Sequence, residues 1–415
     1  MVGFFIEKFH SKPGRLLDPF AGTGTSLFTA QEHGWESVGV EVMPVGVFAM
    51  TARQAANKVC VNELQKTAKS ILGKLPKAMT NVAIKHVPIT KDAFPPETEE
   101  HLNRYIGLCS QIKDESLKTV LQFAAFSVLE GISFTRKDGQ FLRWDYRSVR
   151  NLSGKPFDKG KIFTFEEALL DKIEMITNDL SLPISKTLFS NNGTLQNKPP
   201  IQLFEGSCLD VLPRMENGQF DFVMTSPPYC NRYDYTRTYA LELVYLGIDF
   251  DEMRKLRQTL LSCTVENKDK QELIQTLYSS LDKEKDYQNI QNVYDTLPAM
   301  CEVNEVLEHL NQQNLLNNRA VSKMVRNYFF EMCFVIAEMS RLLKKKGYCV
   351  MVNDNVRYGG EEIPVDLILS SFAEQLGFEV RQIYVLPQGK GNSSQQMGTY
   401  GREEIRKCVY LWQKK

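Results

Sequence analysis

The sequence lacks the residue patterns of metal-binding, disulfide-bonded and membrane-spanning proteins. Its nine cysteines include no Cys-x-x-Cys pair, and its five histidines do not cluster with them. This absence argues against a structural zinc and predicts reduced thiols, as in a cytoplasm. No apolar run approaches the roughly 20 residues that cross a bilayer, and the N-terminus has no signal-peptide pattern. We therefore expect a soluble, intracellular protein with no metal and no membrane partner.

An excess of charge of one sign is also missing. The 415 residues contain 50 lysines and arginines and 50 aspartates and glutamates, so the formal net charge is zero. Any binding to nucleic acid must therefore come from local basic patches and not from the field of the whole molecule. With 43% hydrophobic residues, the chain is long enough to bury one large core plus an accessory region.

The first glycine turn lacks both common phosphate-binding patterns. Residues 16–25 read Leu-Leu-Asp-Pro-Phe-Ala-Gly-Thr-Gly-Thr, a short apolar strand that runs into a glycine turn, and residues 26–33 predict a helix. Leu27 stands where G-x-G-x-x-G requires its third glycine, and no G-K-[ST] follows. The next strand ends in Glu41, whose carboxylate can accept hydrogen bonds from ribose hydroxyls. This layout favours an adenosyl group without a pyrophosphate.

The most informative stretch is Thr225-Ser226-Pro227-Pro228-Tyr229, directly after the apolar strand 220–224. Proline cannot donate to a sheet ladder and fixes φ, so the chain must leave the sheet here. The rigid turn then presents a hydroxyl, free backbone carbonyls and an aromatic face. These groups are what is needed to grip a flat base with an exocyclic amino group. Taken alone, the run is more typical of an ordinary strand-ending turn, so its interpretation depends on the glycine turn upstream.

Together, Asp18-Pro19-Phe20-Ala21-Gly22-Thr23-Gly24-Thr25 and Thr225-Ser226-Pro227-Pro228-Tyr229 resemble the motifs of the amino-methylating DNA methyltransferases, which use S-adenosylmethionine. Motif-like segments cover residues 1–58, 201–247 and 325–415. The serine of Ser-Pro-Pro-Tyr resembles the cytosine-N4 subgroup, whereas adenine-N6 enzymes more often carry Asp or Asn there. The resemblance implies an α/β fold: a doubly wound, mostly parallel seven-stranded sheet with an antiparallel last strand and helical insertions.

The resemblance also assigns roles to residues. It implies a catalytic group of Ser226, Pro227, Pro228 and Tyr229. It implies S-adenosylmethionine contacts from Asp18, Phe20, Gly22, Gly24, Thr25, Glu41 and Asp210. Asp210 is the least direct of these assignments. Relatives often place an acid after the glycine of the strand at 201–207 to meet the adenine amino group, but Ser207 stands there and Asp210 is the candidate replacement.

The proposed chemistry follows from the weakness of an aromatic amino group as a nucleophile. Hydrogen bonds from the amino group to the Ser226 oxygen and the Pro227 carbonyl would aim the nitrogen lone pair at the sulfonium methyl. The base must be flipped out of the duplex, and Tyr229 is the natural surface for it to stack on. Carbon-5 methylation would instead need a cysteine nucleophile. Cys230 suggests that alternative, but it follows the tyrosine, and we interpret it as a packing residue.

Two insertions interrupt the predicted sheet, at about 90–200 and 248–322. Between 134 and 163, the first has eight basic and three acidic residues with interleaved aromatics. Such a stretch suits phosphate contact and base stacking, and a solvated basic loop is the alternative. The second is rich in Glu, Lys, Gln and Asn and predicts polar helices that act as a lid or sequence reader. The DNA-contacting candidates are Arg136, Arg143, Arg147, Arg150, Arg232 and Arg402.

Apolar periodicity predicts the remaining elements. They are helices at 4–9, 44–75, 325–343 and 365–376, strands at 81–87, 201–207 and 347–352, and an antiparallel pair at 378–386 and 408–412. The chain accordingly divides into a cofactor-binding half (1–89), a candidate DNA-contacting insertion (90–200), a catalytic part (201–247), a helical insertion (248–322) and a C-terminal part (323–415).

The leading hypothesis is a site-specific methyltransferase that acts on double-stranded DNA. It would be the protective half of a restriction system with a cognate endonuclease, in a prokaryotic cytoplasm near the nucleoid. Adenine-N6 methylation is the first alternative. An RNA base methyltransferase is a second, although those usually carry Asp in the motif and an added RNA-binding module. A non-catalytic protein with a decayed fold is a third. The chain starts close to its first motif, so a missing upstream segment or a partner polypeptide also stays open.

Overall fold

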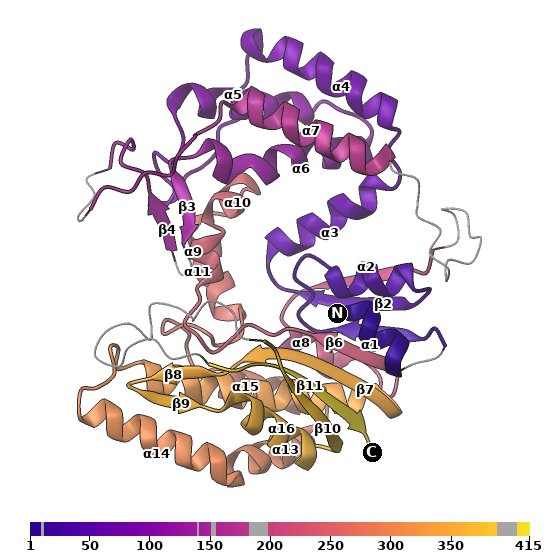
Figure 1. The fold of residues 1–415 in the computed structure, drawn as a ribbon, viewed down its shortest axis with the longest axis vertical. Helices are drawn as coiled ribbons and strands as arrows, with labels where there is room; N and C mark the ends of the chain where they lie inside the picture. The colour runs from indigo at the N-terminus through magenta and orange to yellow at the C-terminus, as the bar shows by residue number, and fades with distance from the viewer. Residues whose placement is uncertain (10–11, 139–140, 151–154, 182–197, 388–404) are drawn as a thin grey trace. The chain divides into compact units, whose positions relative to one another are not determined.

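The structure is a computed structural model that describes residues 1–9, 12–138, 141–150, 155–181, 198–387 and 405–415. The chain forms two compact units (Figure 1). Unit 1 consists of Met1–Met43, Phe189–Tyr233 and Gln258–Lys415, and unit 2 of Pro44–Leu188 and Asp234–Arg257. The two units are defined by contacts between residues. The five segments predicted from the sequence are defined by expected function, so that division remains a prediction.

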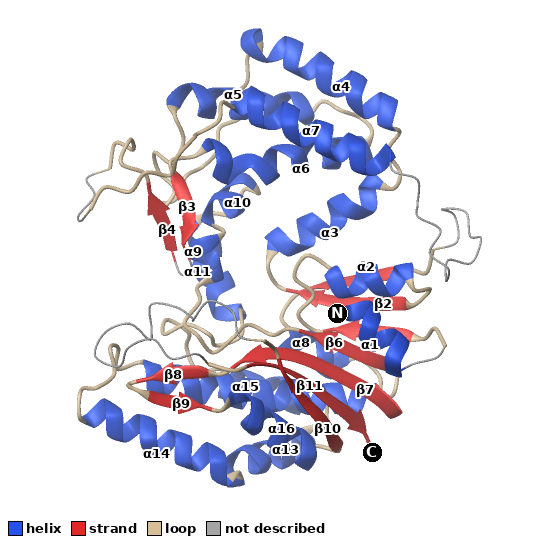
Figure 2. Cartoon of the chain, in the orientation of Figure 1, coloured by secondary structure: helices blue, strands red, loops and turns tan. Residues whose placement is uncertain are grey.

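Unit 1 is built on a seven-stranded sheet with the order β10-β11-β7-β6-β1-β2-β5 (Figure 2). The five strands from β7 to β5 pair in parallel, and β11 is antiparallel to both β7 and β10. The predicted doubly wound sheet with an antiparallel last strand is thus confirmed. The strands are β1 (Arg15–Asp18), β2 (Glu36–Glu41), β5 (Ile201–Glu205), β6 (Phe220–Thr225), β7 (Leu343–Asp354), β10 (Phe378–Val385) and β11 (Lys407–Lys414).

Helices cover both faces of this sheet. On one face, the ring of Phe9 in α1 lies 5.1 Å from the ring of Tyr348 in β7. On the other, Ser370 of α16 accepts a hydrogen bond from the indole N–H of Trp412 at 3.2 Å. Tyr348 is paired with Gln413, and Trp412 points to the opposite side because side chains alternate along a strand. Burial on both faces explains why the inner strands β6 and β11 are mostly apolar, whereas the edge strands β5 and β10 are partly exposed.

The longest helix of unit 1, α15, confirms the predicted helix at 325–343. Val325, Phe329, Met332, Ile336 and Met339 recur at helical spacing, and each is fully buried. The helices of unit 1 are α1 (Val2–Phe9), α2 (Thr25–Glu32), α8 (Cys208–Val211), α12 (Gln271–Ser280), α13 (Glu284–Thr296), α14 (Pro298–Gln312), α15 (Val321–Leu342) and α16 (Val365–Gln375), with 3-10 turns at Leu75–Lys77 in unit 2 and Leu212–Arg214 in unit 1.

Unit 1 also contains a small hairpin that the sequence pattern did not predict. It follows β7 and consists of β8 (Val356–Tyr358) and β9 (Glu361–Ile363), which pair antiparallel. Its turn contains Gly359 and Gly360, both at positive φ, where glycine is favoured. The hairpin matters below because its buried Tyr358 contacts the candidate catalytic turn.

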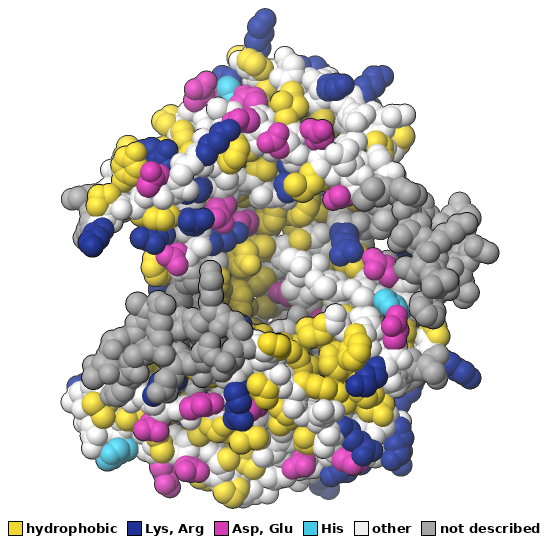
Figure 3. Space-filling model, in the orientation of Figure 1, with side chains coloured by type: hydrophobic (Ala, Val, Ile, Leu, Met, Phe, Trp, Pro, Cys, Tyr) yellow, Lys and Arg dark blue, Asp and Glu magenta, His cyan; other side chains and the backbone are white. Residues whose placement is uncertain are grey.

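Unit 2 is mainly helical, and α6 packs against α3, α5 and α7. Asp114 begins α6, because its side chain accepts a hydrogen bond from the Leu117 N–H at 2.8 Å. A two-stranded ribbon of β3 (Thr135–Asp138) and β4 (Phe141–Trp144) follows α6, and basic and hydrophobic side chains reach the surface over it (Figure 3). The helices are α3 (Pro44–Ala56), α4 (Val61–Lys74), α5 (Pro96–Cys109), α6 (Glu115–Ile132), α7 (Phe165–Ser181), α9 (Tyr235–Thr238), α10 (Ala240–Tyr245) and α11 (Phe250–Thr259), whose last two residues belong to unit 1.

Two predictions in this region are wrong. The helix predicted at 44–75 is two helices, because residues 57–60 form a turn between α3 and α4. The strand predicted at 81–87 does not form. Its alternating apolar residues resemble a strand, but side chains take its backbone donors: the Ile84 N–H bonds Asn103 and the Val87 N–H bonds Thr90. No neighbouring strand within the described residues pairs with it.

Candidate active site

The two sequence motifs follow adjacent parallel strands. The glycine turn at 19–25 follows β1, and the turn at 226–229 follows β6. β1 continues to β2 on one side, whereas β6 lies on its other side, so the order of the strands reverses between them. In open α/β sheets, ligands bind in the crevice outside the carboxyl ends of the strands at such a point.

Asp18, the last residue of β1, connects the two motifs. Its Oδ1 accepts hydrogen bonds from the Thr225 hydroxyl at 2.7 Å and from the Phe20 N–H at 3.0 Å, and its Oδ2 accepts one from the Ser26 hydroxyl. Its side chain is buried, and burial raises the pKa of this carboxyl group above its usual value. The Asp18 carboxylate therefore positions the glycine turn, the start of α2 and the end of β6 relative to one another.

The glycine turn is open on its outer side. Gly22 and Gly24 have φ of 55° and 81°, in the left-handed region that favours glycine. A Cβ on Gly22 would meet nothing within 4 Å. Gly24 precedes the first turn of α2, where Thr25 is exposed, and Phe20 packs half-buried against the core. A ligand can therefore approach the backbone of this turn closely.

Leu27 shows how the chain manages without a third glycine. If Gly39 of β2 had a Cβ, that atom would lie only 2.5 Å from Cδ1 of Leu27, which is too close. The close packing of the first helix on the sheet, which a third glycine commonly permits, is here permitted by a glycine on the neighbouring strand. The first helix can thus pack closely on the sheet although the turn departs from the usual pattern.

Glu41, the last residue of β2, forms a hydrogen bond with the backbone of the glycine turn. Its Oε2 accepts a hydrogen bond from the Gly22 N–H at 2.6 Å, and its Oε1 accepts one from the Met43 N–H at 2.7 Å. Burial raises the pKa of Glu41 to about 7, opposed by these two hydrogen bonds and assisted by the charge of Asp18. A carboxylate has about four acceptor positions, so further hydroxyl donors can still be accommodated.

Asp210 lies on the short helix α8, which follows β5. Its side chain is 55% exposed and accepts a hydrogen bond from Nη2 of Arg214, one turn further along, at 2.9 Å. Ser207 caps α8, since its hydroxyl accepts a hydrogen bond from the Leu209 N–H at 3.4 Å. The backbone N–H of Gly206 bonds the carbonyl of Glu41 at 2.9 Å, which ties the ends of β5 and β2 together.

The residues of the candidate catalytic turn differ in their exposure. Ser226 is exposed, Pro227 is buried and Tyr229 is half-buried. The Ser226 and Tyr229 hydroxyl oxygens are 3.3 Å apart. Burial raises the pKa of Tyr229, the hydrogen bond with Ser226 opposes this, and the carboxylate of Asp354 adds to it. Tyr229 is therefore a neutral phenol at neutral pH, with an aromatic face beside a hydroxyl acceptor.

Cys230 and Tyr358 hold this turn on the core. The Cys230 thiol is fully buried in the hydrophobic core, and burial raises its pKa well above the usual value. Such a thiol is a poor nucleophile and a good packing group. The buried Tyr358 hydroxyl donates a hydrogen bond to the Cys230 carbonyl at 2.6 Å. No local sequence signal pointed to Tyr358, because it lies 128 residues further along the chain.

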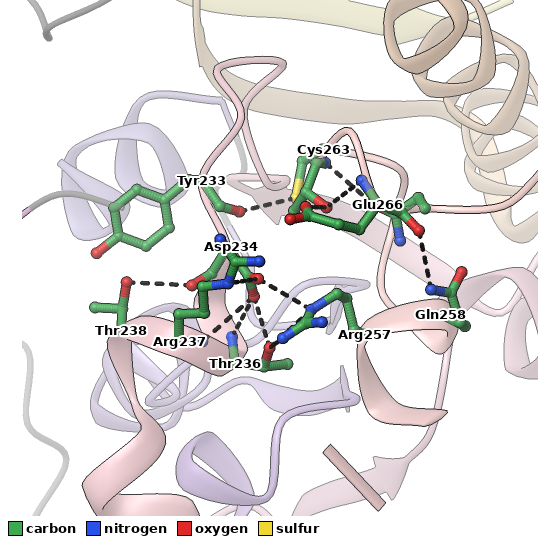
Figure 4. Close-up of polar contacts among 11 residues, drawn as sticks. Tyr233, Asp234, Thr236, Arg237, Thr238, Arg257, Gln258, Cys263 and Glu266 are labelled. Carbon is green, nitrogen blue, oxygen red and sulfur yellow. Dashed lines mark hydrogen bonds and ion pairs between the residues drawn. The ribbon is translucent and has the colours of Figure 1, made fainter. Parts of the chain in front are cut away.

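The residues after the turn are anchored separately in each unit (Figure 4). In unit 1, Arg232 has a left-handed φ of 67° and donates to the Asn317 side chain at 3.0 Å, and the Tyr233 carbonyl accepts a bond from the Cys263 thiol at 3.4 Å. In unit 2, Asp234 caps α9 and pairs with Arg257 at 2.9 Å.

A buried ion pair fixes the segment that carries Cys263. Nζ of Lys270 lies 2.8 Å from Oε1 of Glu331 in α15, and the side chains are 8% and 1% exposed. Ser262 joins them: its N–H bonds Oε2 of Glu331 at 2.8 Å, and its hydroxyl bonds Oε1. Burial raises the pKa of Glu331, and the nearby lysine opposes the shift.

The predicted DNA-contacting arginines of unit 2 fall into two groups. Arg147 forms two hydrogen bonds with the buried carboxylate of Asp145, at 2.6 and 2.8 Å, and this pairing lowers the pKa of Asp145. Arg150 donates to two backbone carbonyls, at 2.6 and 2.8 Å, and lies over the Trp144 ring. Arg136 and Arg143, which are exposed as Arg147 is, lie opposite each other on β3 and β4 and make no contact with a buried carboxylate among the described residues. Arg402 lies outside the described residues.

Thr225 and Ser26 were given no role by the sequence, although Thr225 belongs to the quoted motif. Both were missed because their role is to bond Asp18, which only the fold brings within reach. Within the described residues, no group of three or more His, Cys, Asp or Glu side chains could hold a metal ion. In the same residues, no helix has the length and apolar content needed to span a membrane.

A doubly wound sheet with a glycine turn and a Ser-Pro-Pro-Tyr turn at neighbouring strand ends defines a methyltransferase of the α/β class. Comparison with known proteins agrees, although no family model matches the chain. The chain is 44% identical over 419 residues to the Type II methyltransferase M.AvaI of Nostoc sp. and of Anabaena variabilis. It is 40% identical over 429 residues to M.BsoBI of Geobacillus stearothermophilus. Each alignment covers the whole chain and 83% of the relative. The chain belongs to this family of Type II DNA methyltransferases.

Proposed function

We propose that the protein transfers a methyl group from S-adenosylmethionine to the exocyclic N4 amino group of a flipped cytosine at a specific site in duplex DNA. The observation that carries this proposal is the hydrogen bond between Asp18 and Thr225 at 2.7 Å. It joins the strand end that leads into the glycine turn to the strand end that leads into Ser226 and Tyr229. A cofactor held by the first turn would then lie beside a base held by the second.

The residues around the glycine turn fit S-adenosylmethionine. The open side of Gly22 offers room for a ligand against the backbone, and Glu41 retains acceptor positions for two ribose hydroxyls. We propose cofactor contacts from Phe20, Gly24 and Thr25 in the same turn. Asp210 stays the candidate for the adenine amino group, which would compete with Arg214 for its carboxylate. When bound, the cofactor supplies an electrophilic methyl group on a sulfonium.

The protein's part in the chemistry is to position and polarise a weak nucleophile. The exposed Ser226 hydroxyl and the Pro227 carbonyl are acceptors for the two amino hydrogens of cytosine, and Tyr229 is the stacking surface. The N–C bond forms as the S–C bond breaks, and one amino proton leaves to water. No side chain needs to form a covalent bond with the base. The buried, neutral thiol of Cys230 supports this route over carbon-5 methylation.

The biological setting is part of the same proposal. The relatives are named as Type II methyltransferases. We infer that this protein is likewise the modifying half of a restriction system, paired with a cognate endonuclease that recognises the same sequence, in a bacterial cytoplasm.

Nucleoside analysis tests the reaction. Duplex DNA with a randomised central segment is incubated with the protein and S-adenosylmethionine carrying an isotope-labelled methyl group, digested to nucleosides and examined by mass spectrometry. We expect labelled N4-methylcytosine. N6-methyladenine would overturn the base assignment, 5-methylcytosine would overturn the mechanism, and label only in an RNA added as a second substrate would overturn the proposed substrate.

Two variants locate the chemistry in the turn. Tyr229→Ala should lose base stacking worth about 1–3 kcal/mol, whereas Tyr229→Phe should retain most of it. Cofactor affinity, measured by calorimetry, should be unchanged in both. Equal turnover by the wild type and Tyr229→Ala would mean that the base binds elsewhere.

A further inference from the structure

The β3–β4 ribbon of unit 2 has two chemically different faces. Side chains alternate along a strand, so residues paired across the ribbon share a face. Thr135 pairs with Trp144 and Lys137 with Leu142, and these side chains are buried or half-buried. The other face, which we call the ribbon face, consists of four exposed residues: Arg136, Asp138, Phe141 and Arg143.

The inner face is occupied by contacts within unit 2. Nζ of Lys137 lies 2.5 Å from the buried carboxylate of Glu242 and 4.5 Å from the centre of the Tyr239 ring. Lys137 is therefore part of the packing of the unit, although it belongs to the same basic stretch as Arg136. The pairing of β3 with β4 therefore places the residues that anchor the ribbon on one face and the exposed residues on the other.

The ribbon face brings little to folding. Arg136 and Arg143 are directly opposite each other, and like charges at such positions are destabilising. Arg143 and Asp138 form an ion pair with atoms 3.5 Å apart, but the side chains are 47% and 51% exposed, and pairs of this kind add little stability. Phe141 is 53% exposed. The ribbon thus exposes charged side chains and an aromatic ring. This exposure lowers the stability of the fold, and binding of a ligand would offset the loss.

The guanidinium of Arg143 contacts both an aromatic ring and a carboxylate. It lies 4.1 Å from the centre of the Phe157 ring, and stacking of this kind limits the orientations of an arginine side chain. Its Nη1 lies 3.5 Å from Oδ2 of Asp138. A planar fork of donors therefore stands next to an acceptor, and both belong to the same face of the ribbon.

We propose that the ribbon face binds in the major groove of duplex DNA and that Arg143 and Asp138 together recognise a G·C base pair in the target sequence. The proposal rests on the proposed function of the protein. The major groove admits a two-stranded ribbon. There, guanine presents the acceptors O6 and N7, which match the arginine fork, and its paired cytosine presents an N4 amino group, which matches a carboxylate. An arrangement with a carboxylate is less suited to phosphate alone, because Asp138 would repel it.

The experiment measures which sequences the protein selects. Duplex DNA with a randomised central segment is incubated with the wild type, and the bound fraction is sequenced, so the readout needs no methyl transfer. The wild type should enrich one motif. Arg143→Ala should enrich the same motif except at one G·C position, where preference falls by roughly 5- to 150-fold. Arg143→Lys, which keeps the charge but loses the planar fork, should retain duplex binding but show a weaker preference than the wild type at that position.

A matched control is available on β10, outside both insertions. Arg381 is also exposed and pairs with the Glu379 carboxylate at 2.5 Å, with side chains that are 42% and 50% exposed. Arg381→Ala removes the same charge and should leave the selected motif unchanged. Replacing the guanine at the affected position by 7-deazaguanine, which lacks the N7 acceptor, should weaken the wild type and not Arg143→Ala.

The outcomes separate this inference from the function on which it rests. If the wild type selects no motif and binds no duplex, the proposed function fails. If the wild type and Arg143→Ala select identical motifs with equal preference at each position, the function stands and the ribbon inference is overturned. If Arg143→Ala instead weakens binding to all sequences equally and leaves the preference at each position unchanged, the arginine contacts phosphate, and base recognition is again overturned.

Discussion

The hydroxyl of Thr225 donates a hydrogen bond of 2.7 Å to the carboxylate of Asp18, across a sequence separation of 207 residues. Each residue ends a strand and precedes one of the two candidate functional turns, so the bond links the starts of the two turns. Its strength depends on burial: Asp18 and Thr225 are 4% and 3% exposed, and water cannot replace a lost partner there.

Replacing Thr225 by valine tests this relationship. Thr225→Val keeps the shape of the side chain but leaves the buried Oδ1 of Asp18 with one donor fewer. We expect the free energy of unfolding, measured in urea, to fall by about 1–3 kcal/mol, and turnover to fall as well. Thr225→Ser is the control, because it retains the hydroxyl. A Thr225→Val variant as active and stable as the serine variant would show that the bond does not position the site.

The raised pKa of Glu41 predicts opposite pH effects on stability and on cofactor binding. Because the pKa rises from 4.5 to about 7 on folding, the folded protein holds this proton more tightly than the unfolded chain. Its contribution to stability is thus fully present below 4.5 and is lost as the pH rises through about 7. Glu41→Gln should lack this part of the pH dependence in thermal unfolding.

Binding of S-adenosylmethionine should instead improve as the pH rises through the same range. Ribose hydroxyls bond a charged carboxylate more strongly than a neutral one. Below the pKa of Glu41, the dissociation constant should increase by up to about tenfold per pH unit, measured by calorimetry. In Glu41→Gln the binding should be weaker and nearly independent of pH. A wild-type affinity that is constant over this range would contradict a role for the Glu41 carboxylate.

Placing a carboxylate on the glycine turn should abolish cofactor binding. In Gly22→Asp the side chain would occupy the open space beside the turn, next to the Glu41 carboxylate. Gly218→Asp is a matched control: its φ of 62° resembles the 55° of Gly22, and a Cβ there also meets nothing within 4 Å. Both variants should bear similar backbone strain, but only Gly22→Asp should lose binding. Undiminished affinity in Gly22→Asp would remove this turn from the cofactor site.

The ion pair between Lys270 and Glu331 should be important for stability. Lys270→Met leaves the Glu331 carboxylate buried without its cation, and we expect a loss of about 3–5 kcal/mol in urea unfolding. The double variant Lys270→Met and Glu331→Leu should recover most of this loss, since no charge then remains unpaired. Lys161→Met, which breaks an exposed pair with Glu167, should cost under about 1 kcal/mol. Equal losses from Lys270→Met and Lys161→Met would contradict the burial argument.

Local sequence patterns determined much of the fold. The strands and helix around the glycine turn, the strand that leads into Ser226 and the long helix α15 were predicted near their observed limits. Each has a periodic apolar pattern that is set by its own residues, and prolines or glycines mark its ends. The strand predicted at 81–87 does not form, because the pattern of one segment does not determine whether it has a partner. A strand needs a partner, and here the side chains of Asn103 and Thr90 take the backbone donors.

By itself, the sequence determined which residues are the candidates for the chemistry, because the two motifs are contiguous runs whose groups are recognisable without their surroundings. Only the tertiary structure decided how they are held. Asp18 bonds Thr225, and Tyr358 bonds the Cys230 carbonyl, through contacts between segments far apart in the chain. The fold likewise separated Arg147, engaged with Asp145, from Arg143, displayed on the ribbon. Charge and composition are the same for both arginines. Their partners differ because hydrogen bonds and ion pairs arise from packing in three dimensions, which local sequence does not encode.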